Sequence, residues 1–90
     1  MSYLVTLHRK AERALEKLPK REAERIVGAI KQMESEPMAG DVLRLAGTGR
    51  PLWRRRIGDY RLIFSVSHDR NLVIVEDIVR RTSQAYERLP

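Results

Sequence analysis

The 90-residue sequence predicts a single α+β domain, a two-layer sandwich in which a helical hairpin packs on one face of a mainly antiparallel sheet. Residues 9–36 repeat their apolar side chains with a helical period, whereas residues 52–79 alternate apolar and polar side chains as strands do. The segments are short and closely spaced, and residues 1–90 are enough for only one core. The predicted order is β-α-α-β-β-β, with a short C-terminal tail or helix.

The first half of the chain predicts one strand and two helices. Residues 3–8 (YLVTLH) are β-branched and short enough for a strand. Residues 9–18 then place apolar side chains on one helical face, and Pro19 ends that helix. A second amphipathic helix is predicted over residues 20–36, before Pro37. The two helices therefore form a hairpin with charged outer faces.

The second half predicts a loop and three strands. Residues 35–53 place several glycines and prolines around short apolar patches, which is typical of a connecting loop. Tight turns are expected at Gly58-Asp59 and at residues 69–71, so the strands form an antiparallel meander. The strands are expected over residues 52–58, 60–68 and 71–79.

Strand alternation gathers arginines on the face of the sheet away from the helices. In the strand predicted over residues 60–68, the side chains that face the helices are expected to be Tyr60, Leu62, Phe64 and Val66. Those that face away are Arg61, Ile63 and Ser65. In WRRRI the two apolar residues belong with the core, so Arg54 and Arg56 fall beside Arg61. Three such cations repel one another unless something anionic lies among them. Arg55 falls on the core side and is expected to reach the sheet edge or to sit on a bulge.

The charge of the chain is concentrated in its second half. Its net charge is +6, and residues 44–90 carry ten Lys/Arg against five Asp/Glu. Every Lys or Arg after Lys31 is an arginine, whose planar fork binds phosphate oxygens in pairs. This composition suits a polyanion or an acidic protein; the alternative is a merely soluble arginine-rich surface.

Cellular location and metal chemistry are constrained by what the sequence lacks. It contains no cysteine, and therefore no disulfide and no thiolate metal site. It has neither a signal peptide nor an apolar run long enough to span a membrane. A soluble, cytoplasmic protein without a membrane partner is therefore expected.

Three features of the sequence are the order of its strands and helices, the hairpin WRRRIGDYRLIF and the tail VRRTSQAY. In these features the chain resembles the RelE/ParE superfamily of small toxins from type II toxin–antitoxin modules. The resemblance implies a cognate acidic, RelB-like antitoxin. In the RelE-like branch it also implies a ribosome-dependent mRNA endoribonuclease that needs no metal or other cofactor, because the 2′-hydroxyl of the RNA attacks the adjacent phosphate. ParE-like members keep the fold and inhibit DNA gyrase, which is the alternative function.

The resemblance also implies a set of site residues. The expected catalytic residues are Arg54, Arg56, Arg61, Arg81 and Tyr86, and the expected RNA-binding residues are Arg44, Arg50, Arg55 and Arg80. Family tails differ in length, so Arg80 remains an alternative to Arg81. An arginine is a poor base because its guanidinium stays protonated at neutral pH, so Tyr86 or a group of the ribosomal RNA is the candidate for proton transfer. The alternative for Tyr86 is a packing role.

Four other residues could carry chemistry, but a structural role is expected for each. His8 and His68 lie at the end of a strand and at a hairpin tip, where solvated histidines are common. Adjacent strand carboxylates point to opposite faces, so for Glu76 and Asp77 a salt bridge with the arginine cluster is expected rather than a metal site. Trp53 is expected in the core.

Overall fold

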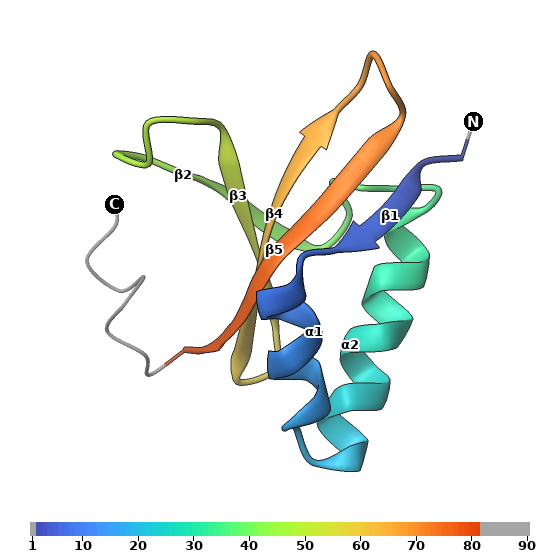
Figure 1. The fold of residues 1–90 in the computed structure, drawn as a ribbon, viewed down its shortest axis with the longest axis vertical. Coiled ribbons are helices and arrows are strands. Elements are labelled where there is room, and N and C mark those ends of the chain that lie inside the picture. Colours follow the sequence, from blue (N-terminus) through green and yellow to red (C-terminus); the bar gives the residue numbers. More distant parts are fainter. Residues whose placement is uncertain (1, 82–90) are drawn as a thin grey trace.

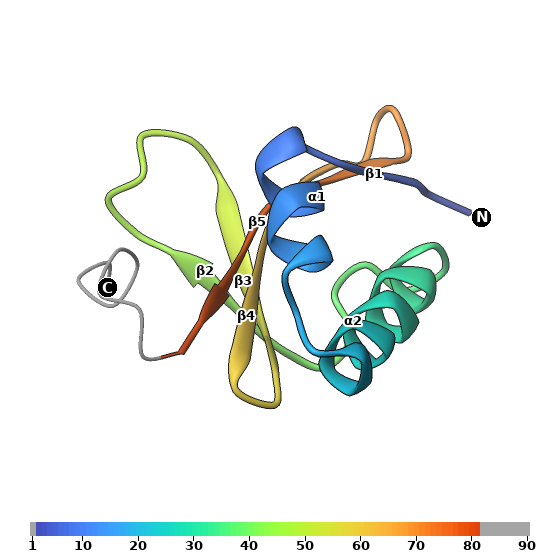
Figure 2. The same ribbon diagram turned by 60° about the horizontal axis from the view of Figure 1, so that its bottom comes forward.

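The computed structural model, which describes residues 2–81, is a five-stranded sheet with two helices on one face (Figures 1 and 2). The elements are β1 (Leu4–Leu7), α1 (Arg9–Glu16), α2 (Lys20–Met33), β2 (Asp41–Leu45), β3 (Leu52–Ile57), β4 (Tyr60–Ser67) and β5 (Leu72–Arg80). The strand order is β1-β5-β4-β3-β2, with β1 parallel to β5 and every other pair antiparallel. The predicted α+β class and the helical hairpin on a mainly antiparallel sheet are confirmed.

The loop prediction for residues 35–53 is wrong at its centre, where Asp41–Leu45 form β2 at the edge of the sheet. β2 pairs with β3 over its whole length, from Asp41 opposite Arg56 to Leu45 opposite Leu52. The glycines and prolines on either side of this segment indicated a loop. A strand of only five residues at the edge of a sheet is stabilised by pairing with its neighbour, and the local sequence does not show that pairing. As a consequence, a carboxylate lies beside the arginines of β3.

The main core lies between the helices and the sheet. Phe64 and Val75 from the sheet are fully buried, as is Met33 from α2, and Ile26 is 1% exposed. Burying a side chain of this size contributes about 1.5–3 kcal/mol, so these contacts hold the helix pair on the sheet. The side chains of β4 that were predicted to face the helices pack here: Tyr60, Leu62 and Phe64 lie in this core and Val66 packs against it.

The opposite, open face of the sheet has a small apolar cluster of its own. Ile63 lies on this face, as the alternation predicts, but its side chain is only 1% exposed. It packs with Leu45 and Leu52, while Val79 lies against the cluster. The twist of a narrow sheet brings these side chains together, and β2, which supplies Leu45, was not expected as a strand.

A register shift in β5 interrupts the alternation of its side chains. Ile63 pairs with Asp77 and the next residue, Phe64, pairs with Val75, so Glu76 is the additional residue of a β-bulge. A bulge bends its strand and redirects the side chains around it. Both acidic residues of β5 are therefore placed by the bulge and not by simple alternation.

Candidate functional site

Three arginines lie together on the open face of the sheet, as the alternation predicts. Arg54 pairs with Ile63 across β3 and β4, and Arg56 lies directly opposite Arg61. Directly opposed residues on antiparallel strands have Cβ atoms about 4.5–5.5 Å apart, so these side chains are neighbours. We call Arg54, Arg56 and Arg61 the arginine face.

Arg54 is held by an acidic residue of the neighbouring strand. Its Nη1 donates to the carboxylate Oδ1 of Asp41 at 3.1 Å and to the carbonyl oxygen of Asp41 at 3.0 Å. The Arg54 side chain is only 12% exposed, whereas that of Asp41 is 58% exposed. Asp41 therefore supplies one of the anions that an arginine cluster requires, and it fixes the direction of the Arg54 side chain.

Arg56 and Arg61 form the more accessible part of the arginine face. Arg56 is exposed, and Arg61 is half-buried with its Nε fully buried. Like charges directly opposite each other on paired strands destabilise the sheet, and an anion bound between them would remove that repulsion. Guanidinium forks bind phosphate in a bidentate manner, so this pair is suited to a phosphate group.

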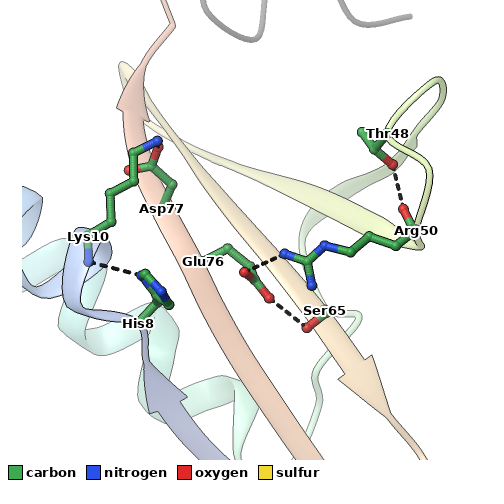
Figure 3. Close-up of polar contacts among 7 residues, drawn as sticks. All are labelled: His8, Lys10, Thr48, Arg50, Ser65, Glu76 and Asp77. Atoms are coloured by element: carbon green, nitrogen blue, oxygen red, sulfur yellow. Dashed lines mark hydrogen bonds and ion pairs between the residues drawn. The ribbon is translucent and has the colours of Figure 1, made fainter.

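A second polar group lies on the open face at the other end of the sheet (Figure 3). Arg50, in the loop between β2 and β3, donates from Nη2 to Oε1 of Glu76 at 2.6 Å. The hydroxyl of Ser65 donates to Oε2 of the same carboxylate at 3.1 Å. Glu76 thus forms a salt bridge with an arginine, but with Arg50 of the β2–β3 loop and not with the arginine face as predicted. This salt bridge holds the Arg50 side chain against the sheet.

Arg55 lies on the helix side, outside the arginine face. It pairs with Leu62 in an uninterrupted stretch of the β3–β4 ladder, so of the two predicted alternatives the bulge is absent there. Its Nη2 donates to Oε1 of Gln32 on α2 at 2.6 Å, and its Nε and Nη1 are buried without a hydrogen-bond partner among residues 2–81. Burial lowers the pKa of this guanidinium. Arg55 therefore joins β3 to the end of α2, a structural position for a residue expected to bind RNA.

Two further arginines of the predicted RNA-binding set also lie on the helix side. Arg44 is exposed and pairs with Trp53, whose side chain packs against the main core. Arg80 is exposed and pairs with Tyr60, another residue of that core. The register therefore separates both from the arginine face.

Arg81 follows the last strand on the side of the arginine face. Its backbone N–H donates at 2.7 Å to the carbonyl oxygen of Asp59, one of the two residues that flank the Tyr60–Arg80 pair, and β5 ends at Arg80. Alternation then places Arg81 on the same side as Arg61. This placement favours Arg81 over Arg80 as the additional arginine of the site. Tyr86 lies outside the described residues.

The other polar residues singled out by the sequence have structural contacts. His8 is the N-cap of α1 and accepts a hydrogen bond at Nδ1 from the backbone N–H of Lys10. Exposed His68 contacts the Tyr3 hydroxyl through Nδ1 at 2.9 Å. Asp77 is 4% exposed and pairs with Lys10 Nζ at 3.1 Å, so its partner is a lysine and not the expected arginine. Among residues 2–81 no group of three or more His, Asp or Glu side chains could hold a metal ion.

Sequence reasoning missed two contacts of the arginines, Asp41 with Arg54 and Gln32 with Arg55. Asp41 could have been found from the alternation in DVLRL, since a strand there would place a carboxylate beside β3. The contact of Gln32 depends on where the end of α2 meets the sheet, and no local pattern indicates that position.

Comparison with known proteins identifies the family. The family model described as the ParE toxin of the type II toxin–antitoxin system parDE matches residues 5–86. The chain belongs to the RelE/ParE superfamily of toxins. No curated protein sequence matches it. Within residues 2–81 no helix is both long enough and apolar enough to cross a membrane.

Solved structures of this toxin superfamily share the fold. A chain of the archaeal RelE–RelB complex from Pyrococcus horikoshii is 35% identical, with a TM-score of 0.80 over 91% of this chain and 98% of that one. The RelBE2 toxin–antitoxin complex of Mycobacterium tuberculosis matches at 24% identity and a TM-score of 0.80, over 90% and 100% of the two chains. The isolated RelE toxin of E. coli matches at 19% identity and a TM-score of 0.70, over 94% and 92%. The protein is a type II toxin with a RelE-like fold.

Proposed function

We propose that this toxin is a ribosome-dependent mRNA endoribonuclease that inhibits translation, and that the arginine face is its active site. The observation that carries the proposal is the direct opposition of Arg56 and Arg61 on the open face, with Arg54 fixed beside them. Two guanidinium groups that lie side by side on one sheet face can bind the oxygens of a single phosphate in a bidentate manner. The 35% identity to a chain of an archaeal RelE–RelB complex supports the same branch of the superfamily.

The proposed reaction uses the RNA as its own nucleophile. The 2′-oxygen attacks the adjacent phosphorus, the bond from phosphorus to the 5′-oxygen breaks, and a 2′,3′-cyclic phosphate remains. One proton leaves the 2′-hydroxyl and one is delivered to the departing 5′-oxygen, so the step is balanced without a metal or another cofactor. The protein must stabilise the doubly charged phosphorane and guide these two protons.

The residues divide this work according to their chemistry. Arg56 and Arg61 would bind the scissile phosphate, where a cationic donor at developing charge contributes about 2.7–4 kcal/mol by analogy with oxyanion holes. Arg54 would orient the strand of RNA, since Asp41 already holds its guanidinium. Arg81 would complete the set of cations. Guanidinium groups do not act as bases at neutral pH, so Tyr86 or a group of the ribosomal RNA would transfer the protons.

The proposed protein partner is an acidic, RelB-like antitoxin in the cytoplasm. Two of the structures that resemble this chain are RelE–RelB or RelBE complexes. An acidic segment that covers the arginine face would neutralise it and block access of RNA, with affinity that falls as salt rises.

The second candidate function is inhibition of DNA gyrase without nuclease activity. The observation in its favour is the match of the ParE toxin family model over residues 5–86. Inhibition of this kind requires contact with gyrase but no catalytic cluster. The arginine face would then be a binding surface only.

One experiment separates the two functions. The purified toxin is added to ribosomes programmed with an end-labelled transcript, and in parallel to gyrase with relaxed plasmid. The endonuclease proposal predicts cleavage products ending in a 2′,3′-cyclic phosphate, dependent on the ribosome, with supercoiling unaffected. An intact transcript together with blocked supercoiling would replace it with the gyrase proposal.

A further inference from the structure

A second cluster of cations lies on α1, separate from the arginine face. Arg9, Arg13 and Lys17 are spaced four residues apart along α1 and its C-cap, so their side chains follow one side of the helix. No salt bridge within 4 Å joins any of the three to another residue of the described chain. None of the three cations is therefore neutralised by a salt bridge within the described residues.

These side chains surround an open hollow of about 450 Å³, which we call the α1 hollow. Its lining residues are His8, Arg9, Lys10, Arg13, Ala14, Lys17 and Asp77. Asp77 is the single acid among them, and its side chain is 6% exposed. It accepts the backbone N–H of Ile78 at 2.8 Å and pairs with Lys10 at 3.1 Å, so it is already engaged within the fold. The charge that the hollow presents to solvent is positive.

β5 separates the α1 hollow from the open face of the sheet. Figure 3 shows Lys10 extending from α1 to Asp77 of this strand, and Arg50 reaching Glu76 from the side of β4. α1 covers the face of the sheet opposite the arginine face (Figures 1 and 2), so a ligand bound in the α1 hollow leaves the arginine face accessible. The toxin has two basic surfaces that can be occupied at the same time.

We propose that the α1 hollow is a second RNA-binding surface, which contacts the phosphates of structured, double-helical RNA while the arginine face holds the mRNA; this inference rests on the proposed function. Phosphate contacts dominate protein–nucleic acid affinity and need only correctly spaced cations. The largest apolar side chain in the lining is Ala14, so a protein partner would find no apolar anchor there. On a ribosome the natural source of such phosphates is ribosomal RNA.

The test compares two triple variants that each remove three positive charges. Arg9→Ala/Arg13→Ala/Lys17→Ala removes the cations of the α1 hollow. The matched control, Arg21→Ala/Lys31→Ala/Arg70→Ala, removes exposed cations on α2 and in the β4–β5 turn. Thermal melting by circular dichroism checks that both variants fold.

Binding to a short fluorescent RNA duplex is measured by anisotropy at several salt concentrations. Each lost phosphate contact lowers the slope of log K against log salt by about 0.9, by analogy with duplex DNA. The hollow variant should therefore lose about two to three units of slope and bind about tenfold more weakly or worse, while the control changes about twofold or less. Equal losses in the two variants would overturn the proposal, because net charge alone would then explain the binding.

Cleavage assays distinguish this inference from the proposed function. On programmed ribosomes the hollow variant should need about tenfold more toxin for half-maximal cleavage, with an unchanged single-turnover rate at saturation. If the wild type cleaves no transcript, the proposed function fails while the duplex measurement still decides the α1 hollow. A hollow variant that binds the duplex normally but loses affinity for an acidic antitoxin would overturn the RNA proposal in favour of a protein contact.

Discussion

Substitution of Gly40 by alanine tests the close contact between the backbone before β2 and the Arg55 side chain. Gly40 has a φ of 86°, and a Cβ built on it would lie 2.8 Å from Nε and 3.1 Å from Cζ of Arg55. The left-handed backbone conformation costs an alanine about 1–2 kcal/mol. Displacing the buried guanidinium also breaks its hydrogen bond to Gln32, and a bond of this charged type is worth about 1.5–3 kcal/mol. Gly40→Ala should therefore destabilise the protein by about 2.5–5 kcal/mol.

Urea unfolding of Gly40→Ala, Arg55→Ala and the double variant measures the free energy of the clash between a Cβ at position 40 and the Arg55 side chain. In the Arg55→Ala background, Gly40→Ala should cost only the backbone term of about 1–2 kcal/mol. Gly47→Ala is the matched control, because Gly47 has a φ of 74° and nothing within 4 Å of its Cβ position. An equal cost for Gly40→Ala with and without the Arg55 side chain would show that the contact carries no energy.

Three further predictions concern the open face, the buried acid of β5 and the proposed proton transfer. Ile63→Ala should lower the free energy of unfolding by about 2–5 kcal/mol, measured in urea, since Ile63 is 1% exposed. Asp77→Ala should lower the free energy of unfolding by about 1–3 kcal/mol in the same measurement, because it leaves the N–H of Ile78 without its acceptor. Lys10→Met should lower it by less than about 1 kcal/mol, because the Lys10 side chain is 65% exposed. Tyr86→Phe should slow single-turnover cleavage without a change in melting temperature; an unchanged rate would assign Tyr86 to packing.

The arginine face could be predicted from the sequence because local rules determine it. Alternation, the apolar residues on either side of the arginines in WRRRI and the tight turn at Gly58 together fix which side chains share a face. Long amphipathic helices are equally well determined by their period, although α2 ends at Met33 and not at residue 36. These features need no knowledge of distant neighbours.

The features that sequence reasoning missed all depend on neighbours distant in the chain. β2 is stabilised by pairing with β3, and with it come Asp41 beside Arg54 and Leu45 over Ile63. Arg55 followed its alternation to the helix side, but its partner lies on α2. A local pattern indicates which face a residue takes, and only the assembled fold shows what covers that face.

The most direct test of the central claim is the single-turnover cleavage rate of Arg61→Ala on programmed ribosomes. A lost cationic contact at developing charge costs about 2.7–4 kcal/mol, and each 1.4 kcal/mol is about tenfold, so the rate should fall at least about a hundredfold while ribosome binding persists. Arg21→Ala, which removes an exposed cation from α2, should cleave like the wild type. An Arg61→Ala variant that also cleaves at the wild-type rate would contradict the assignment of the arginine face as the active site.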